Sequence, residues 1–323
     1  MRYHFLSSLV DGPWGGGNQF LKALRKELIR QHAYTDQPVE GDVILFNSHH
    51  NLRSVVWAKV QSPRCIFIHR LDGPMSYRGR VGRSLDEKIF FFNRNLSDGT
   101  IFQSKWSQAK SYEQGRIQST FETVIPNAPD PEIFYFGTRA INDPRKIRLV
   151  STAWSSAEEK GADVFQFLDN FLNFDKYEVS YVGRISGKYK NIRVLTPLTS
   201  KALGGFLRTQ DIFVFASRYE ACSNSLLEGL HCGLWVIALD SSSNAEVLSN
   251  RGELFSSKAE LLVKIDKVAN QLRNAASPPE PSRNINDVAR SYIKFAETIA
   301  AAVTDGSYSF RRWAWLKTLP RLV

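Results

Sequence analysis

The chain has 323 residues, a hydrophobic content of 43% and a formal net charge of +10. This length exceeds the size at which a single hydrophobic core usually splits, so it predicts two globular domains, and the composition excludes a disordered or low-complexity chain. The basic excess predicts anionic partners. Because the sequence lacks an RNA-binding aromatic signature, a zinc-finger spacing and a dense Lys/Arg run, these partners are expected to be phosphates or anionic lipid, not nucleic acid.

The three cysteines, Cys65, Cys222 and Cys232, cannot all pair within one chain, and none has a metal-ligand spacing. They are expected to be free thiols in a reducing compartment. The apolar run at the N-terminus is too short for a signal peptide, and no segment approaches a membrane-spanning length. These features predict a cytoplasmic protein.

The first half of the chain alternates β-branched and aromatic runs with helical patterns. The expected strands are residues 3–10, 42–47, 65–70, 99–104 and 121–127, and the expected helices are 18–31, 52–61, 85–95 and 107–115. This alternation predicts βαβ units and a parallel sheet covered on both faces.

Residues 127–146 are rich in Pro, Asn, Asp and Gly and are expected to link two domains. A second alternating series follows, with expected strands at 146–153, 177–183, 211–217 and 235–240 and expected helices at 161–172, 200–210 and 224–233. The fold class predicted is therefore α/β, with two Rossmann-like doubly wound domains, 1–140 and 141–280, facing across a cleft.

The C-terminal region, 281–323, contains a long helical pattern at 285–303, which is expected to cross back and pack on the N-terminal domain. The tail at 307–323 mixes basic and aromatic residues. Two interpretations of this tail stay open: a segment lying at an anionic membrane surface, and a terminal helix docked on the other domain.

Two glutamates, Glu220 and Glu228, stand on both sides of a predicted strand-to-helix turn. Ser223 and Asn224 between them are good helix N-cap residues. The backbone amides of Asn224, Ser225 and Leu226 are then expected to point out of the helix start and to bind an anion. A carboxylate is unfavourable beside a phosphate, so Glu228 is expected to accept hydrogen bonds from a ribose, and Glu220 from a sugar.

Residues 217–248 resemble the donor site of retaining glycosyltransferases of the GT-B fold, family 4 type, whose signature is two glutamates separated by seven residues. The glycine-rich stretch 15–24, the segment 67–74 and the segment 151–161 look like further elements of this family in the right order. The resemblance covers most of the chain.

The resemblance implies roles for several residues. Lys160 would contact the donor diphosphate, and the backbone at Gly16 and Gly17 would approach the ligand closely. His69 would lie by the transferred sugar, and Asp72 would orient the sugar or the acceptor; with Glu220 these form the expected catalytic set.

Three features depart from the family, one of which is Trp235 where relatives often carry a proline, expected to be a packing change. Ser155 stands where many relatives carry a second diphosphate-binding arginine, and Arg184 or Arg70 could replace that arginine. Serines at 241–243 replace glycines that many relatives carry before a late glutamate, here Glu246, and could stiffen a loop near the sugar.

Each candidate also has a structural interpretation. Glu228 could be a solvated residue or a partner for a nearby cation, His69 a hydrogen-bonded core histidine, and Lys160 a surface lysine. A cation at a helix N-terminus is unfavourable to the helix dipole, which supports an anionic ligand at Lys160.

The resemblance therefore implies a retaining, metal-independent hexosyltransferase that moves a sugar from a nucleotide-diphosphate donor to a glycan or lipid-linked acceptor, in cell-surface polysaccharide or lipopolysaccharide synthesis. It is expected to act in the cytoplasm, peripherally at the inner membrane face, with no cofactor and no metal. The alternatives are a nucleotide-sugar epimerase and a catalytically silent sugar-nucleotide-binding or scaffold protein. Acceptor-dependent turnover separates the first hypothesis from both.

Overall fold

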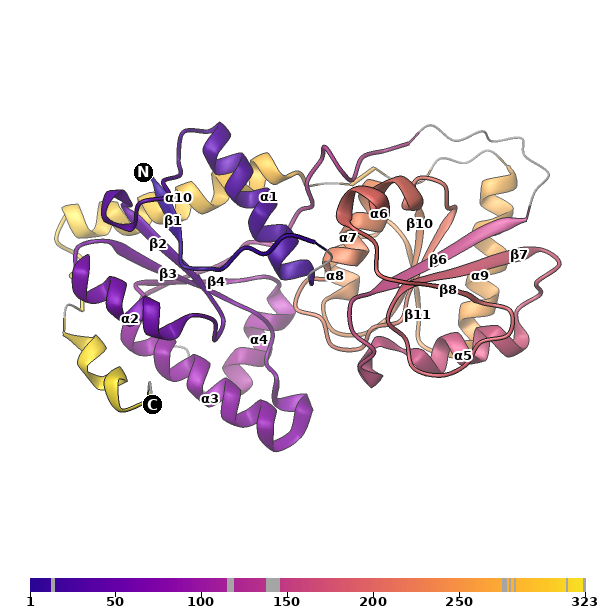
Figure 1. The fold of residues 1–323 in the computed structure, drawn as a ribbon, viewed down its shortest axis with the longest axis horizontal. Coiled ribbons are helices and arrows are strands. Elements are labelled where there is room, and N and C mark those ends of the chain that lie inside the picture. Colours follow the sequence, from indigo (N-terminus) through magenta and orange to yellow (C-terminus); the bar gives the residue numbers. More distant parts are fainter. Residues whose placement is uncertain are drawn as a thin grey trace. The chain divides into compact units, whose positions relative to one another are not determined.

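The computed structural model describes residues 1–12, 15–114, 119–137, 146–274, 278, 280–281, 283–311 and 313–321. The chain forms two compact units (Figure 1). The first unit consists of Met1–Leu9, Lys22–Pro126 and Ile285–Val323, and the second of Val10–Leu21 and Asn127–Asn284. We describe each unit by itself.

The sheet of the first unit has five parallel strands in the order β1-β2-β3-β4-β5. Their bounds are β1 Tyr3–Phe5, β2 Val43–Asn47, β3 Ile66–Leu71, β4 Gly99–Phe102 and β5 Phe121–Val124. An isolated parallel bridge joins Tyr3 to Tyr34 on the free edge of β1. The chain therefore passes outside β1 before it returns to β2, which reverses the direction of winding and makes the sheet doubly wound.

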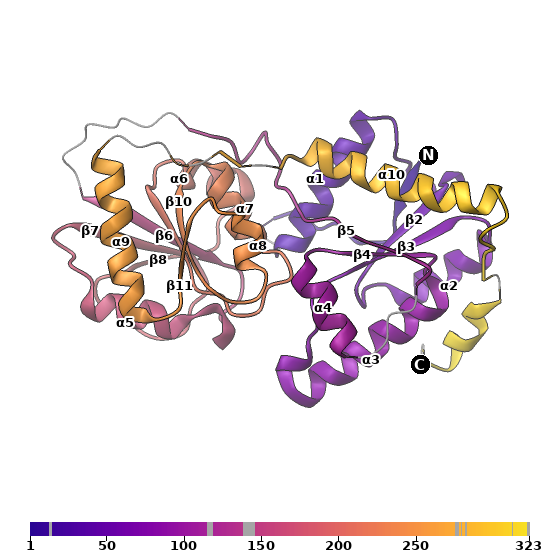
Figure 2. The same cartoon turned by 180° about the vertical axis from the view of Figure 1, so that it is seen from behind.

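Helices cover both faces of this sheet. They are α1 Gly16–Arg30, α2 Leu52–Gln61, α3 Gly79–Leu96, α4 Lys105–Glu113 and α10 Ile285–Thr304, with short 3₁₀ helices η1 Pro38–Glu40, η2 Ser76–Arg78 and η4 Ala314–Arg321. Figures 1 and 2 show α1 and α10 on one face and α2, α3 and α4 on the other. Since both faces are covered, every residue of β2 and β3 is buried, as expected for a parallel sheet.

The C-terminal segment is an integral part of the first unit. A Cβ at Gly99 of β4 would lie 2.6 Å from Ile299 of α10, so the helix packs directly on strand backbone. Beyond α10, Tyr308 donates a hydrogen bond to Asp98, whose carboxylate also forms a buried ion pair with Lys59 at 3.0 Å. The predicted return of the C-terminal helix is present in the structure.

The second unit contains six parallel strands in the order β11-β10-β9-β6-β7-β8. Their bounds are β6 Ile147–Ala153, β7 Tyr177–Gly183, β8 Arg193–Leu195, β9 Ile212–Phe215, β10 Trp235–Leu239 and β11 Glu253–Phe255. Counted from β6, this is the 3-2-1-4-5-6 order of a dinucleotide-binding fold, with its reversal between β6 and β9. Ligands of such sheets bind beyond the carboxyl ends of the strands at this reversal.

Two layers of helices enclose the second sheet (Figure 1). Their bounds are η3 Glu158–Lys160, α5 Ala162–Phe171, α6 Ser200–Leu207, α7 Asn224–His231, α8 Asn244–Leu248 and α9 Lys258–Arg273. One core cluster joins α5 and α9 to the sheet and a second joins α6, α7 and α8. The prediction of two doubly wound α/β units is therefore confirmed, whereas their facing across a cleft stays a prediction.

The domain boundary in the structure differs from residue 140. Residues 138–145 lie outside the described part, and the second unit already begins at Asn127. The reason is that residues after β5 pack on the second unit: Phe134 is buried in its core, and the carbonyl of Ile133 accepts a hydrogen bond from Arg208 at 2.8 Å. Val10–Leu21, which includes the glycine-rich stretch, also belongs to the second unit.

Candidate functional site

The candidate site lies at the carboxyl ends of β6 and β9, where the second sheet reverses. Gly161, between η3 and α5, has a φ of 81°, and a Cβ there would lie 2.6 Å from the backbone oxygen of Ala216. Only glycine combines this conformation with such a close approach. The loop after β6 is thereby held against the end of β9, which places Lys160 beside the loop that follows β9.

Lys160 and Glu220 form an ion pair in this position. Lys160 Nζ lies 2.5 Å from Glu220 Oε1, and the Ser217 hydroxyl donates to the same oxygen at 2.7 Å. Both charged side chains are partly accessible, with 26% of Lys160 and 18% of Glu220 exposed. The structure therefore brings together the two residues predicted to hold the diphosphate and the sugar, and it adds Ser217, which the sequence analysis did not single out.

The serine-rich loop before α8 holds the Glu220 loop in place. Ser242 accepts a hydrogen bond from the Glu220 amide at 3.1 Å, and Ser241 donates one to the Arg218 carbonyl at 2.7 Å. Asn244 donates to the Ser217 carbonyl at 3.1 Å. The side chains that replace the family's glycines thus bind the loop that carries Glu220. Ser242 adopts a φ of 50°, a conformation that favours glycine.

The start of α7 presents open backbone amides. Ser223 is the N-cap, as predicted, and its hydroxyl accepts from the Leu226 amide at 3.3 Å. The cap therefore already uses the Leu226 amide, and a role of this amide in ligand binding stays a prediction. The amides of Asn224 and Ser225 have no acceptor among the described residues. Two amides at a helix N-terminus suit an anionic oxygen.

The glycine-rich stretch lies against this helix start. A Cβ at Gly16 would lie 2.8 Å from Asn224 Cβ, whereas Gly17 has open space around its Cα. Asn224 Oδ1 accepts a hydrogen bond from buried Asn127 at 3.2 Å. The backbone of Gly16 therefore lies against Asn224 at the helix start, whereas its close approach to a ligand stays a prediction. Asn127 is a supporting residue for which the sequence offered no separate signal.

Arg184 stands at the end of β7, near the loop that contains Ser155. Its guanidinium lies 5.0 Å from the ring centroid of Trp154, which directly precedes Ser155. Gly183 makes this turn possible, since a Cβ there would lie 1.8 Å from the Ala153 oxygen. Arg184 is exposed. The guanidinium of Arg184 thus lies over an aromatic ring near Ser155, the position at which similar proteins are expected to carry a diphosphate-binding arginine.

Glu228 is a buried carboxyl group in the second turn of α7. It is 7% exposed, and no cation among the described residues pairs with it. Burial raises the pKa of Glu228 to about 8. A solvated glutamate and an ion-paired one are both excluded by this environment. A carboxyl group kept inside a site without a charged partner is suited to hydroxyl groups of a ligand.

His69 lies within β3 of the first unit and is fully buried. Its Nε2 donates to the Ser48 carbonyl at 2.8 Å, its Nδ1 lies 3.2 Å from Asn93 Nδ2, and its ring stacks on Phe46. Burial lowers the pKa of His69 to about 4. Both ring nitrogens are occupied, so the structure supports the interpretation as a hydrogen-bonded core histidine and not the predicted contact with a sugar.

Asp72 follows the end of β3 and is 32% exposed. It accepts hydrogen bonds from Gln103 at 2.7 Å and from Asn47 at 3.3 Å, and it lies 3.3 Å from the buried Arg70 guanidinium. Its position at the carboxyl edge of the first sheet agrees with an orienting role for a ligand hydroxyl. Arg70 supports Asp72 in the first unit, whereas the diphosphate-binding candidates lie in the second.

Among the described residues, neither a metal-binding cluster nor a membrane-spanning helix is found. They contain no group of three or more His, Cys, Asp and Glu side chains arranged to hold a metal ion. Within the same residues, none of the helices combines the length and the apolar character that a bilayer crossing requires.

The comparisons with known proteins agree with this geometry. Residues 176–277 match the family described as Glycosyl transferases group 1, a segment that runs from β7 past α9 and includes Glu220, Ser223 and Glu228. A comparison with curated proteins gives no significant match.

Solved structures with the same fold are numerous. A glycosyltransferase from Rickettsia africae has a TM-score of 0.61 at 14% identity, over 92% of this chain and 98% of that chain. Sucrose-phosphate synthase from Thermosynechococcus elongatus has a TM-score of 0.58 at 11% identity, over 90% and 78%. The pneumococcal O-GlcNAc transferase, solved with UDP and GlcNAc, has a TM-score of 0.55 at 12% identity, over 80% and 57%. The chain therefore has the fold of GT-B glycosyltransferases, and its second unit carries the segment that matches the glycosyl transferases group 1 family.

Proposed function

We propose that this protein is a retaining hexosyltransferase, which moves a sugar from a nucleotide-diphosphate donor to a glycan or lipid-linked acceptor. The observation that carries this proposal is the grouping of Lys160, Glu220 and two open helix amides at the reversal of the second sheet. This grouping lies at the strand ends where doubly wound sheets bind nucleotides.

A nucleotide-sugar donor has three parts, a diphosphate, a ribose and a sugar, and each is assigned to different residues of the site. Lys160 and the amides of Asn224 and Ser225 bind the diphosphate, whose negative charge grows as the sugar leaves. Arg184, held over Trp154, adds a second cation at the same edge. Glu228 accepts hydrogen bonds from the ribose hydroxyls. Because these groups neutralise the leaving diphosphate, the proposed transfer needs no metal ion.

The reacting sugar is assigned to Glu220. Glu220 changes partner from Lys160 to sugar hydroxyls when Lys160 engages the diphosphate, so the ion pair keeps both groups ready in the free protein. Asp72, at the carboxyl edge of the first sheet, is assigned to orienting a hydroxyl of the acceptor. The leaving phosphate takes the acceptor proton, and retention follows without a covalent protein intermediate. His69 supports β3 from the core in this proposal.

The names of the similar structures support this chemistry. One is an O-GlcNAc transferase solved with UDP, and another is a sucrose-phosphate synthase. Polysaccharide or lipopolysaccharide synthesis at the cytoplasmic face of an anionic membrane is the proposed setting, because the net charge of +10 favours an acidic surface.

The test is a donor screen followed by a transfer assay. Thermal stability is measured with UDP, GDP, CDP and their sugar conjugates, with magnesium and with a chelator. A bound nucleotide raises the unfolding temperature by mass action. We expect one nucleotide to stabilise the protein equally in both conditions, and Lys160→Ala to weaken binding about tenfold or more. Lys201→Ala, an exposed lysine of the same unit, is the matched control.

Sugar transfer is then assayed with the donor that the screen selects and with lipid-linked glycan acceptors. The anomeric configuration of the product, determined by NMR, must equal that of the donor. Donor binding without turnover on any acceptor would favour a silent sugar-nucleotide-binding protein, and loss of the stabilisation in both Lys160→Ala and Lys201→Ala would contradict the assignment of the site.

A further inference from the structure

The C-terminal 3₁₀ helix η4 has three faces with different surroundings. A 3₁₀ helix has three residues per turn, so residues three apart lie above one another. Residues 315, 318 and 321 therefore form one stripe, and residues 316 and 319 form another, which residue 313 extends directly before the helix, since its carbonyl accepts a hydrogen bond from the Leu316 amide at 3.1 Å. We call the second of these the outer stripe; it consists of Trp313, Leu316 and Leu319.

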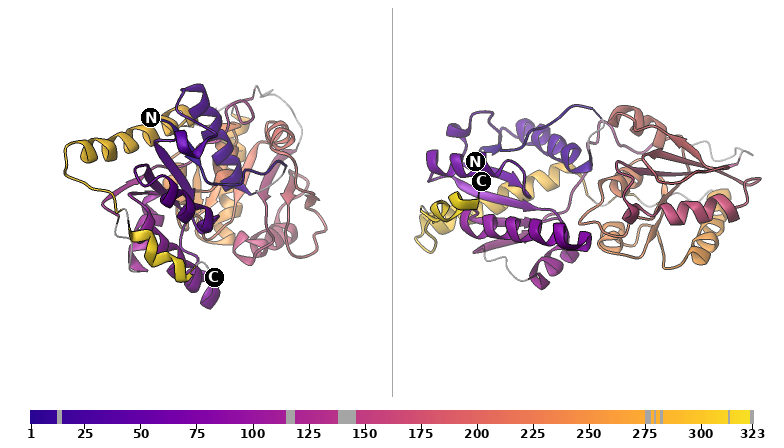
Figure 3. Two further views of the ribbon diagram at one scale, coloured as in Figure 1. Left: turned by 60° about the vertical axis from the view of Figure 1, so that its left-hand side comes forward. Right: turned by 60° about the horizontal axis from the view of Figure 1, so that its bottom comes forward.

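The inner stripe fixes η4 on the first unit. Trp315 packs against the core cluster formed by α2, α3 and the sheet, and Thr318 is fully buried. The guanidinium of Arg321 lies 4.0 Å from the ring centroid of Phe91 in α3. Figures 2 and 3 show η4 lying beside α3. The orientation of η4 is therefore set by one face, and the outer stripe cannot turn inward.

The outer stripe is exposed although all its side chains are large and apolar. Trp313 is 73% exposed, Leu316 48% and Leu319 45%. On α2, which touches η4, Trp57 is 62% exposed. Single exposed apolar residues need no explanation, but a stripe of three on a docked helix is an unpartnered face.

The charges beside the stripe identify its partner. From residue 306 to 323 the sequence has four basic residues and no acidic one. Lys317 is exposed on the third face of η4, which adjoins the outer stripe, and Arg311 donates to the carbonyl of Arg94 at 3.0 Å. Large apolar side chains with flanking cations are the composition of helices that lie in the interface of an anionic bilayer.

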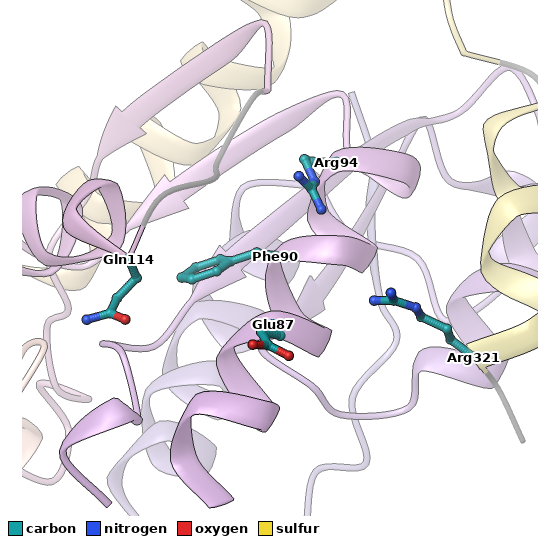
Figure 4. Close-up of a pocket in the computed structure, with 5 residues that line it drawn as sticks. All are labelled: Glu87, Phe90, Arg94, Gln114 and Arg321. Carbon is teal, nitrogen blue, oxygen red and sulfur yellow. The ribbon is translucent and has the colours of Figure 1, made fainter. Parts of the chain in front are cut away.

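A pocket at the end of η4 adds a place for an anionic group. It has a volume of about 310 Å³ and is lined by Glu87, Phe90, Arg94, Gln114 and Arg321. Figure 4 shows Arg321 reaching from η4 toward the side of α3 that carries Glu87, Phe90 and Arg94. Two guanidinium groups against one carboxylate leave a net positive charge, and guanidinium groups suit phosphate.

We propose that η4 is a membrane-docking element: the outer stripe inserts into the interface of an anionic bilayer, and the pocket between Arg94 and Arg321 receives a lipid phosphate. This proposal deepens the location at an anionic membrane given under the proposed function. It does not depend on the donor site, because docking requires neither nucleotide nor acceptor. The protein then binds reversibly at the membrane surface through its first unit.

The test is sedimentation of the purified full-length protein with vesicles, in the absence of nucleotide. Vesicles of phosphatidylcholine alone are compared with vesicles that also contain phosphatidylglycerol. We expect binding to the mixed vesicles that decreases as salt is raised, since attraction between surface charges is screened. Leu316→Ser combined with Leu319→Ser should lower the partition coefficient at least about tenfold. Lys317→Glu should lower it about fivefold or more.

The matched control is Phe171→Ser, which removes a large side chain that is 66% exposed on α5 of the second unit. It should leave vesicle binding unchanged. Because the outer stripe is exposed, the variants should keep the wild-type unfolding temperature. Arg94→Ala tests the pocket and is measured with vesicles and, separately, with free inorganic phosphate. If the variant binds vesicles more weakly than the wild type but binds free phosphate equally well, the pocket is a site for a lipid phosphate.

Three results would overturn the proposal. One is equal binding of wild type and the double serine variant to anionic vesicles. Another is equal binding of the wild type to both kinds of vesicle. The third is concentration-dependent self-association without vesicles that the double serine variant abolishes, which would make the outer stripe an interface between copies of this chain.

Discussion

Glu228 makes stability depend on pH in an unusual direction. Its pKa rises from that of an ordinary glutamate in the unfolded chain to about 8 in the folded protein. The folded state therefore binds a proton that the unfolded state has lost, and stability falls as pH rises from about 4.5 to about 8. Glu228→Gln keeps the shape without the ionisation. We expect it to remove this fall, on the order of 5 kcal/mol, in urea unfolding measured across this pH range.

The same substitution separates folding from ligand binding. Glutamine replaces one carboxyl oxygen with an amide nitrogen, which cannot accept hydrogen bonds from ribose hydroxyls, so Glu228→Gln should be more stable near pH 8 and bind the donor nucleotide more weakly. Parallel pH profiles for the variant and the wild type would instead mean that Glu228 has a partner in solution that the structure does not show.

Ser242 offers a second test at the scale of one residue. Replacing it with glycine relieves a left-handed backbone conformation, worth about 1 kcal/mol, and removes the hydrogen bond to the Glu220 amide, of about the same magnitude. Ser242→Gly should therefore leave the free energy of unfolding nearly unchanged while donor affinity falls, as measured by calorimetry.

Ser249 provides the control for this prediction. It has a φ of 48° at the end of α8, and its side chain makes no hydrogen bond among the described residues. Ser249→Gly should stabilise the protein by about 1 kcal/mol without changing donor affinity. Equal effects of the two substitutions on affinity would show that Ser242 does not act through Glu220.

A local pattern predicts Ser223 correctly, because N-cap preferences define this position. The role of Lys160 follows only from the resemblance to the family and stays a prediction. The environment of His69 could not be predicted in this way. Every position of β3 is buried, since the sheet is covered on both faces, and the strand continues to Leu71. Nothing local in the sequence tells a core histidine inside such a strand from one at its end.

At the scale of elements, the turn from η3 to α5 controls the donor site. In Gly161→Ala, the alanine would have to adopt a φ of 81°, and its Cβ would lie 2.6 Å from the backbone oxygen of Ala216. The turn must therefore move, and we expect it to carry Lys160 away from Glu220. We expect a loss of about 2 kcal/mol in stability and a larger relative loss in donor affinity. Chemical denaturation and nucleotide titration measure the two effects.

Gly306 is the matched glycine for this experiment. It has a φ of 80°, and a Cβ there meets nothing within 4 Å. Gly306→Ala should therefore show the backbone cost alone and leave donor affinity unchanged. A Gly161→Ala protein with normal affinity would mean that the ion pair does not depend on this turn.

The winding of the sheets illustrates what periodicity predicts at this scale. Alternating strands and helices predicted both parallel sheets, but the reversal of the first sheet depends on one bridge at Tyr34. A single bridged residue leaves no apolar run in the sequence. In the second unit the reversal lies between β6 and β9, which are regular strands, and the site there follows from the strand pattern.

At the scale of the whole molecule, composition alone does not predict which segments of the chain belong to which unit. The Pro-rich and Gly-rich stretch that suggested a linker is partly bound to the second unit, because its apolar residues Ile133 and Phe134 pack there. Linker composition and packing compete in this stretch, and burial of the two side chains decides the outcome. The return of Ile285–Val323 to the first unit was predictable because a helix with one apolar face must cover a sheet.

This return predicts how a shortened chain behaves. The face of α10 toward the first sheet buries Val288, Tyr292 and Ile299, and a chain that ends at Asn284 exposes the surface that they cover. Amide hydrogen exchange should then lose protection in β3 and β4 and keep it in β6 and β9. A chain that ends at Asp305 keeps α10 and should retain protection in all four strands, apart from the smaller loss caused by removing Tyr308. Unchanged protection in β3 of the shorter chain would show that the first unit folds without its C-terminal segment. Protection lost in β6 as well would show that the two units unfold together.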